Sequence, residues 1–113
     1  MRAELTKHVI QDDMTLYSGP GNIHSDIDVA KRTGLDAPIA QGMMTLAYAS
    51  ELMTRVHGPE WLEAGQISVK FTKPVLAEDD VTVRAEPGGD GYEIVATNQH
   101  GDVLMVGTAR IVD

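Results

Sequence analysis

IAQGMMTLAYASELMTRVHGP, residues 39–59, carries the longest run of helical periodicity in the 113-residue chain. Apolar side chains recur there at intervals of three and four residues, which is the spacing of one face of an α-helix. Other apolar residues occupy the remaining sides, so we predict a central helix over 39–56 that other structure wraps. The glycine and proline that follow His57 are a helix stop signal.

The period of the apolar pattern changes to two after this helix, as it does in strands whose faces alternate between core and solvent. Residues 67–72 alternate in this way, and so do residues 81–86. Turn-forming residues then lead into two more predicted strands, over 92–97 and 103–112. We therefore predict that the carboxy-terminal half is an antiparallel meander.

We predict shorter helices and a strand in the amino-terminal third of the chain. These are a strand over 6–10, a short helix over 12–17 capped by its two aspartates, and a second short helix that begins after Ser25. No internal repeat, low-complexity tract or linker divides the chain. We expect residues 1–113 to form one α+β domain, in which the hydrophobic helix packs against a sheet of four or five strands.

Composition excludes several classes of function. Seventeen acidic residues against nine basic ones give a net charge of -8, which repels the phosphate backbone of a nucleic acid. The sequence shows no stretch typical of a membrane span or a signal peptide, so we expect a cytoplasmic protein without a membrane partner. The sequence also has no His-Glu-x-x-His zinc motif, no phosphate-binding loop and no dinucleotide-binding fingerprint, so we expect neither a metal nor a cofactor.

GPGNIHSD, residues 19–26, places His24 between a turn and a short helix. An imidazole can take or give a proton near neutral pH, although a lone histidine after such a turn is also an ordinary loop residue. Asn22 either orients a substrate or a water molecule or simply shapes the turn. Asp26 either takes part in catalysis or caps the helix that follows it.

Gly42 stands where the long helix is expected to begin. A backbone N–H at a helix amino terminus can hold negative charge on a substrate oxygen, and a residue without Cβ lets the substrate approach closely. Close packing of the helix amino terminus is another reason for a glycine, and the two reasons are compatible. The other histidines have simple explanations: His8 lies at a strand edge, His57 lies at the carboxy terminus of the long helix and His100 lies in a turn.

Two stretches of this chain, 22–26 and 34–52, resemble the MaoC-like family of (R)-specific enoyl-CoA hydratases and acyl-thioester dehydratases. The matching positions are Asn22, His24, Asp26, Ala30, Ala40, Gly42 and Met43. A third stretch, WLEAGQISVKFTKPVLAEDDVTV at 61–83, is similar to the family's strand and Lys-Pro turn. The resemblance implies a hot-dog fold, in which an antiparallel β-sheet wraps around a long central α-helix.

The chain departs from the family's pattern at two places. Gln41 stands where the family has a histidine before the Gly-Met pair of the helix, and the family uses the backbone amide there. The family's catalytic aspartate follows a glycine, whereas this chain reads Gly19-Pro20-Gly21, so the aspartate is replaced by proline or glycine or lost with a shortened loop. The resemblance therefore keeps His24 and leaves its acid/base partner unassigned.

The resemblance implies an enzyme that hydrates or dehydrates an acyl thioester or a related enone, with His24 as acid/base and the Gly42 N–H as oxyanion donor. We expect the substrate to contact the following residues: Tyr17, Gln41, Met43 and Tyr48. The family also implies a homodimer with its site at the subunit interface. Two alternatives stay open: isomerisation or intramolecular conjugate addition by the same residues, and a non-catalytic subunit that binds acyl thioesters.

Overall fold

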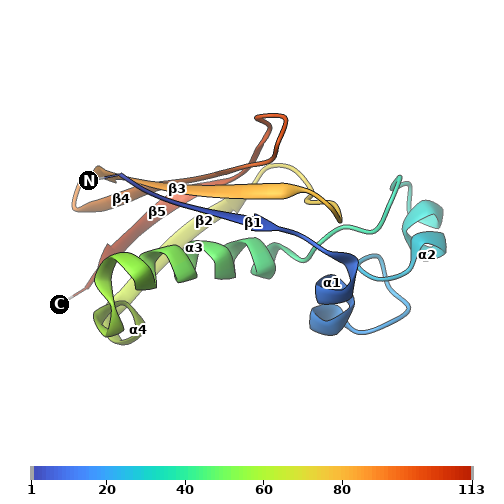
Figure 1. Cartoon of the computed structure of the whole chain (residues 1–113), viewed down its shortest axis with the longest axis horizontal. Helices are drawn as coiled ribbons and strands as arrows, with labels where there is room; N and C mark the ends of the chain where they lie inside the picture. The colour runs from blue at the N-terminus through green and yellow to red at the C-terminus, as the bar shows by residue number, and fades with distance from the viewer. Residues whose placement is uncertain (1, 113) are drawn as a thin grey trace.

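The computed structural model describes residues 2–112, which form one antiparallel sheet with a long helix lying along one of its faces (Figure 1). The strands are β1 (Ala3–His8), β2 (Gly65–Phe71), β3 (Asp80–Gly88), β4 (Gly91–Thr97) and β5 (Val103–Ile111). The helices are α1 (Gln11–Ser18), α2 (Ile27–Arg32), α3 (Gly42–His57) and α4 (Pro59–Ala64). This is the hot-dog architecture that the sequence analysis predicts.

The sheet has the order β1-β3-β4-β5-β2, so only part of it is a meander. β3, β4 and β5 follow one another as predicted, but β2 lies at the far edge beside β5 rather than next to β3. The alternating pattern of a strand identifies its two faces and carries no information on its neighbours. One close approach helps to determine this pairing, because a Cβ at Gly107 of β5 would collide with the Ser68 carbonyl of β2.

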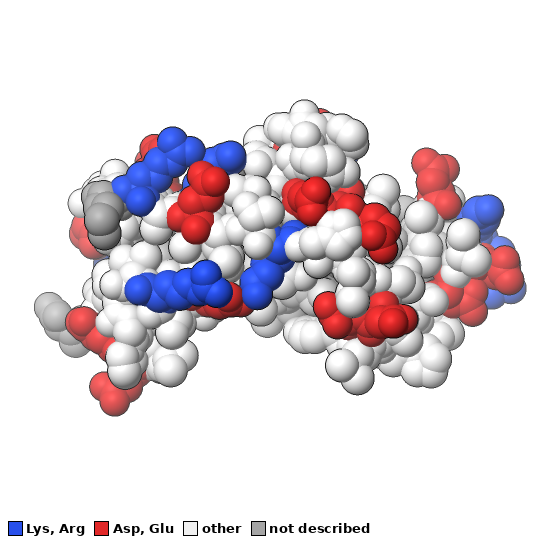
Figure 2. All heavy atoms as spheres, in the orientation of Figure 1, with Lys and Arg blue, Asp and Glu red and all other residues white. Residues whose placement is uncertain are grey.

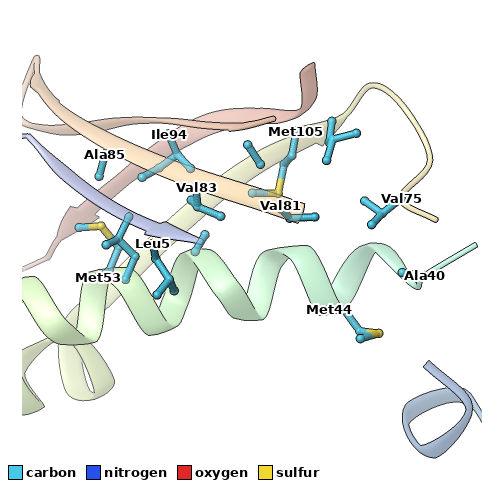
Figure 3. Close-up of a cluster of buried hydrophobic side chains, with 14 of the residues drawn as sticks. Leu5, Ala40, Met44, Met53, Val75, Val81, Val83, Ala85, Ile94 and Met105 are labelled. Carbon is cyan, nitrogen blue, oxygen red and sulfur yellow. The ribbon is translucent and has the colours of Figure 1, made fainter. Parts of the chain in front are cut away.

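The core lies between the sheet and α3 (Figure 3). β3 supplies Val81, Val83 and Ala85, and each of these alternate residues is fully buried. Leu52 and Met53 of α3 meet them from the other side. Burial of such side chains out of water is the main favourable contribution to folding.

Within the single chain, other structure wraps α3 only in part. Met43 and Ala47 are exposed on the side of the helix away from the sheet. Figure 3 shows Met44 pointing away from the sheet as well, toward α1. A second layer therefore covers this side only where α1 reaches it.

Three local predictions differ from the structure near the chain's short helices. The first strand ends at His8 rather than at residue 10, and Ile10 stands at the amino-terminal cap of α1 without a side-chain hydrogen bond. Asp26, not Ser25, caps α2. The helix α4 was not predicted, because Pro59 was interpreted as a stop signal although proline is also favoured in the first turn of a helix.

Charge is unevenly distributed on the face that Figure 2 shows. Lys and Arg side chains gather over the left half of the view, around β1 and the end of α3, and acidic side chains dominate around α1.

Within residues 2–112, no helix is both long and apolar enough to span a membrane.

Candidate active site

The loop that carries His24 is folded around the side chain of Asn22. Asn22 Oδ1 accepts a hydrogen bond of 2.8 Å from the His24 backbone N–H. Its Nδ2 donates to the carbonyls of Ser18 and Gly19, at 3.0 and 3.2 Å, where α1 ends. Asparagine commonly organises a turn in this way, by bonding backbone groups two residues on. The Asn22 side chain therefore holds the loop to α1.

The ring of His24 is oriented by a single hydrogen bond to the backbone. His24 Nδ1 lies 2.7 Å from the carbonyl oxygen of Ile39. A carbonyl oxygen only accepts, so Nδ1 carries the hydrogen and Nε2 keeps the lone pair in the neutral ring. Among residues 2–112, no side chain or backbone group is hydrogen-bonded to Nε2. The ring thus presents a basic nitrogen that can accept a proton.

The carbonyl that holds the ring belongs to a segment fixed from two sides. Ile39 N–H donates to the Ile23 carbonyl at 3.0 Å, and Ala40 N–H donates to the Val75 carbonyl at 2.8 Å. Ile39 also forms a β-bridge with Leu76. This short segment leads directly into α3, so it connects the His24 loop to the helix amino terminus.

Gly42 is the first residue of α3, and its N–H has no hydrogen-bond acceptor among the residues that the structure describes. The first N–H groups of any helix lack partners within the helix, and they carry the positive end of its dipole. Gln41 stands at the amino-terminal cap, and its side chain makes no capping hydrogen bond. Nothing within residues 2–112 therefore competes with a substrate oxygen for the Gly42 N–H.

Asp26 is engaged in a structural interaction. Its Oδ1 accepts hydrogen bonds from the backbone N–H groups of Asp28, at 2.9 Å, and Val29, at 3.3 Å. These are the bonds of a helix cap, and they direct this oxygen at the first turn of α2.

Glu51 is also occupied, because it pairs with Lys7 at 2.8 Å and with Arg55 at 2.7 Å. The hydrogen bond to Lys7 is the largest cause that lowers the pKa of Glu51.

A groove of about 520 Å³ lies between α1 and α3. It is lined by Asp13, Leu16, Tyr17, Met44, Ala47 and Tyr48. Two of the predicted substrate contacts, Tyr17 and Tyr48, therefore share one cavity. Met43 is not among the lining residues and is 52% exposed, whereas its neighbour Met44 lines the groove. Burial, followed by the charges of Asp13 and Glu51, raises the pKa of the Tyr48 phenol.

Two groups that hold the histidine leave no sign in the sequence. One is the Ile39 carbonyl, which any residue could supply and which therefore leaves no signal in the sequence. The other is Gln11 of α1, whose Nε2 donates to the His24 carbonyl at 2.9 Å. A glutamine at the start of a helix is common, so its partner thirteen residues away can be identified only in the folded chain.

The other histidines stand apart from this loop. His8 lies between two carboxylates, with Nδ1 at 2.7 Å from Asp80 and Nε2 at 2.8 Å from Glu78. His57 stacks on Trp61. Within residues 2–112, no group of three His, Cys, Asp or Glu side chains is arranged to hold a metal ion.

Comparison with known proteins gives one family and a set of similar structures. The MaoC like domain family matches residues 1–106 of the chain. A search of curated protein sequences found no match. The family match covers nearly the whole chain, so it includes both the His24 loop and the start of α3.

Similar solved structures cover almost all of the chain. The R-hydratase PhaJ1 from Pseudomonas aeruginosa, in its unliganded form, has 28% identity and a TM-score of 0.76, over 96% of this chain and 77% of that one. HtdX of Mycobacterium tuberculosis has 25% identity and a TM-score of 0.80, over 96% of this chain and 47% of that one. The (R)-hydratase from A. caviae involved in PHA biosynthesis has 21% identity and a TM-score of 0.74, over 99% and 95%, which shows a shared fold.

Proposed function

The chain belongs to the MaoC-like domain family, and on that premise we propose that it is a hydratase/dehydratase of enoyl thioesters in which His24 is the acid/base. The substrate we propose is a trans-2-enoyl-CoA or a related acyl thioester. The name of PhaJ1, an R-hydratase, supports the R configuration for the 3-hydroxyacyl product. Residues 1–113 act in this proposal as one domain.

The observation that carries the proposal is the hydrogen bond between His24 Nδ1 and the Ile39 carbonyl. It leaves Nε2 as the nitrogen with the lone pair, which is what a general base needs. The same carbonyl lies three residues before Gly42, whose N–H is open at the start of α3. A base and an oxyanion donor are therefore supported by one connected piece of backbone.

The reaction we propose uses His24 twice. Nε2 takes a proton from water while the water oxygen bonds to the β-carbon of the enoyl group, and the electron pair of the double bond moves toward the thioester oxygen. The Gly42 N–H hydrogen-bonds this oxygen as its negative charge develops. The protonated imidazole then returns the proton to the α-carbon, so that the elements of water are added and the histidine is neutral again. Dehydration is the reverse sequence.

The remaining site residues have supporting roles in this proposal. Asn22 and Asp26 are positioning residues, because their side chains hold the loop and the start of α2 on either side of His24. Tyr17 and Tyr48 contact the acyl chain in the groove between α1 and α3. Gln41 and Met43 flank Gly42 and contact the thioester end of the substrate.

We propose that two chains associate through the β2 edge of the sheet and the exposed sides of α1 and α3. β2 is an edge strand, and an unpaired edge offers its N–H and C=O groups to another strand. Met43, Leu16 and Tyr17 are exposed apolar side chains of α3 and α1. A homodimer that covers them would complete the wall of the substrate site, and it predicts twice the chain mass by light scattering.

One feature of the sequence favours a second reaction. We infer from the stretch Gly19-Pro20-Gly21 that the family's catalytic aspartate is replaced or lost in this chain, so His24 is the only acid/base group assigned in this proposal. Isomerisation of an enone, or addition of a hydroxyl from the same substrate, needs one base and one oxyanion donor. A non-catalytic subunit that binds acyl thioesters would need neither.

The test is hydration of short, medium and branched trans-2-enoyl-CoA substrates by the purified protein. We expect the wild type to consume at least one of them and His24→Ala to lose the activity while keeping the wild-type melting temperature. His57→Ala is unsuitable as a control because that ring packs against Trp61 and Tyr92, so His100→Ala, an exposed turn residue, serves instead. A wild type that binds these substrates without converting them would favour the binding subunit.

A further inference from the structure

Phe71 is the last residue of β2, and its side chain lies on the side of the sheet that faces α3. It pairs with the buried Met105 of β5, and residues directly opposite each other in an antiparallel pair share a face. β2 is an edge strand, so no further strand covers the ring, which is 48% exposed. The ring thus lies at the open side of the core, beside the amino terminus of α3.

The ring packs directly on Gly42. A Cβ at position 42 would lie 2.9 Å from both Cε2 and Cζ of Phe71, closer than real Cβ contacts. Gly42 is not among the glycines with positive φ, so its backbone conformation does not itself require a glycine. The position of the Phe71 ring therefore gives a physical reason for the missing side chain.

This contact places an apolar ring beside an open hydrogen-bond donor. The Gly42 N–H has no acceptor within residues 2–112, and phenylalanine offers none. An apolar neighbour excludes water from one side of the donor and lowers the local dielectric constant. A hydrogen bond to developing negative charge is stronger in such surroundings than in water.

We propose that Phe71 is a positioning residue of the oxyanion site, whose ring holds the first residue of α3 in place and keeps water away from the Gly42 N–H. This inference rests on the proposed hydratase function, because the Gly42 N–H is an oxyanion donor only in that reaction. Phe71 acts through Gly42 and transfers no proton. Its effect belongs to the transition state, in which the thioester oxygen carries the negative charge.

The test compares Phe71→Ala with Phe71→Leu on the enoyl-CoA that the wild type hydrates best. We expect Phe71→Ala to lower kcat about tenfold and to change KM less than about threefold, because the donor is used most strongly in the transition state. Phe71→Leu should recover most of kcat, since apolar bulk is enough to exclude water. Leu62→Ala is the matched control, as Leu62 is an exposed apolar residue on α4.

A second variant keeps the test valid if Phe71→Ala folds poorly. Gly42→Ala retains the N–H but adds a methyl group against the ring, and it should lower kcat in the wild-type background. Because the clash is with Phe71, the same substitution should cost much less in Phe71→Leu, whose shorter side chain can withdraw from position 42. Melting temperatures of all variants separate loss of folding from loss of rate.

The outcomes distinguish this inference from the function on which it rests. An active wild type whose kcat survives Phe71→Ala within about twofold overturns the role of Phe71 alone. A raised KM with unchanged kcat also overturns it, because the ring would then contribute to ground-state binding. If Gly42→Ala lowers kcat by the same factor in the wild-type and the Phe71→Leu backgrounds, the clash with the Phe71 ring is not the cause of the loss. A wild type without activity on any enoyl-CoA overturns the proposed function as well.

Discussion

The chain contains two Asn-x-His turns that are built alike and lie in different surroundings. In one, Asn22 Oδ1 accepts from the His24 N–H at 2.8 Å, and in the other, Asn98 Oδ1 accepts from the His100 N–H at 2.9 Å. The first turn lies between two helices, and its imidazole is held by the Ile39 carbonyl. The second closes the β4–β5 hairpin, and its imidazole is exposed.

The difference lies in what the rest of the fold brings to each ring. His24 meets a carbonyl fifteen residues away that selects one tautomer and one orientation. His100 has a long contact of 3.4 Å with its own neighbour, Gln99. Local sequence therefore makes both turns, and tertiary structure holds the imidazole of His24 in one orientation.

The largest expected effect separates the two histidines themselves. We expect His24→Gln to lower kcat/KM for hydration about 10²- to 10⁴-fold, the usual contribution of a general acid/base. His100→Gln should leave kcat/KM within about twofold, as substitutions of exposed residues generally do. Steady-state kinetics on one enoyl-CoA measures both. Equal losses in the two variants would mean that the histidines do not differ in function.

The two asparagines should differ in rate but not in stability. Each substitution to alanine removes turn-forming hydrogen bonds, so we expect Asn22→Ala and Asn98→Ala each to lower the free energy of unfolding by about 1 kcal/mol. Only Asn22→Ala should also lower kcat, by about tenfold or more, because it lets the base move. Urea unfolding and kinetics check the pair. A normal rate in Asn22→Ala would show that the loop keeps His24 in place without it.

A smaller effect on the rate is expected from the glutamines that contact the two turns, Gln11 of α1 and Gln99 within the second turn. Gln11→Ala removes the hydrogen bond to the His24 carbonyl, and we expect kcat to fall about two- to fivefold. Gln99→Ala removes a hydrogen bond to Asp79 and should leave the rate unchanged. The two variants measured side by side show whether α1 contributes to the position of His24. Similar rates in both would assign Gln11 to stability alone.

The smallest effect concerns His8, a third histidine in a different setting. Hydrogen bonds to Asp80 and then to Glu78 raise the pKa of His8, so its contribution to stability is complete below the unfolded value of about 6.5. That contribution is lost as the pH rises through the higher folded pKa. We expect His8→Gln to lower the melting temperature slightly in acid and not in alkali. A difference that grows with pH would contradict the pairing.

Much of the fold could be predicted from periodicity. The alternation of Val81, Val83 and Ala85 identifies β3 and its buried face, and the long apolar run identifies α3, because both patterns are local. The place of β2 at the far edge and the helix α4 could not be predicted. The first depends on which strands meet in space, and the second depends on Pro59, which both stops one helix and starts the next.

The candidate site could be predicted less completely than the fold. His24 and Gly42 were identified by their residue types and by the family motif. Their supports, the Ile39 carbonyl and the Phe71 ring, are contacts between distant segments that carry no local signal. The exposed side of α3 shows the same limit, because its apolar residues predict a partner layer that the single chain supplies only near α1.

The most direct measurement is to incubate the wild type with a trans-2-enoyl-CoA in D2O and to identify the product by mass spectrometry and NMR. A hydratase with His24 as acid/base predicts a 3-hydroxyacyl-CoA with one deuterium on the α-carbon, formed by the wild type and not by His24→Ala. A product with a shifted double bond and no added water, or unchanged substrate, would contradict the account.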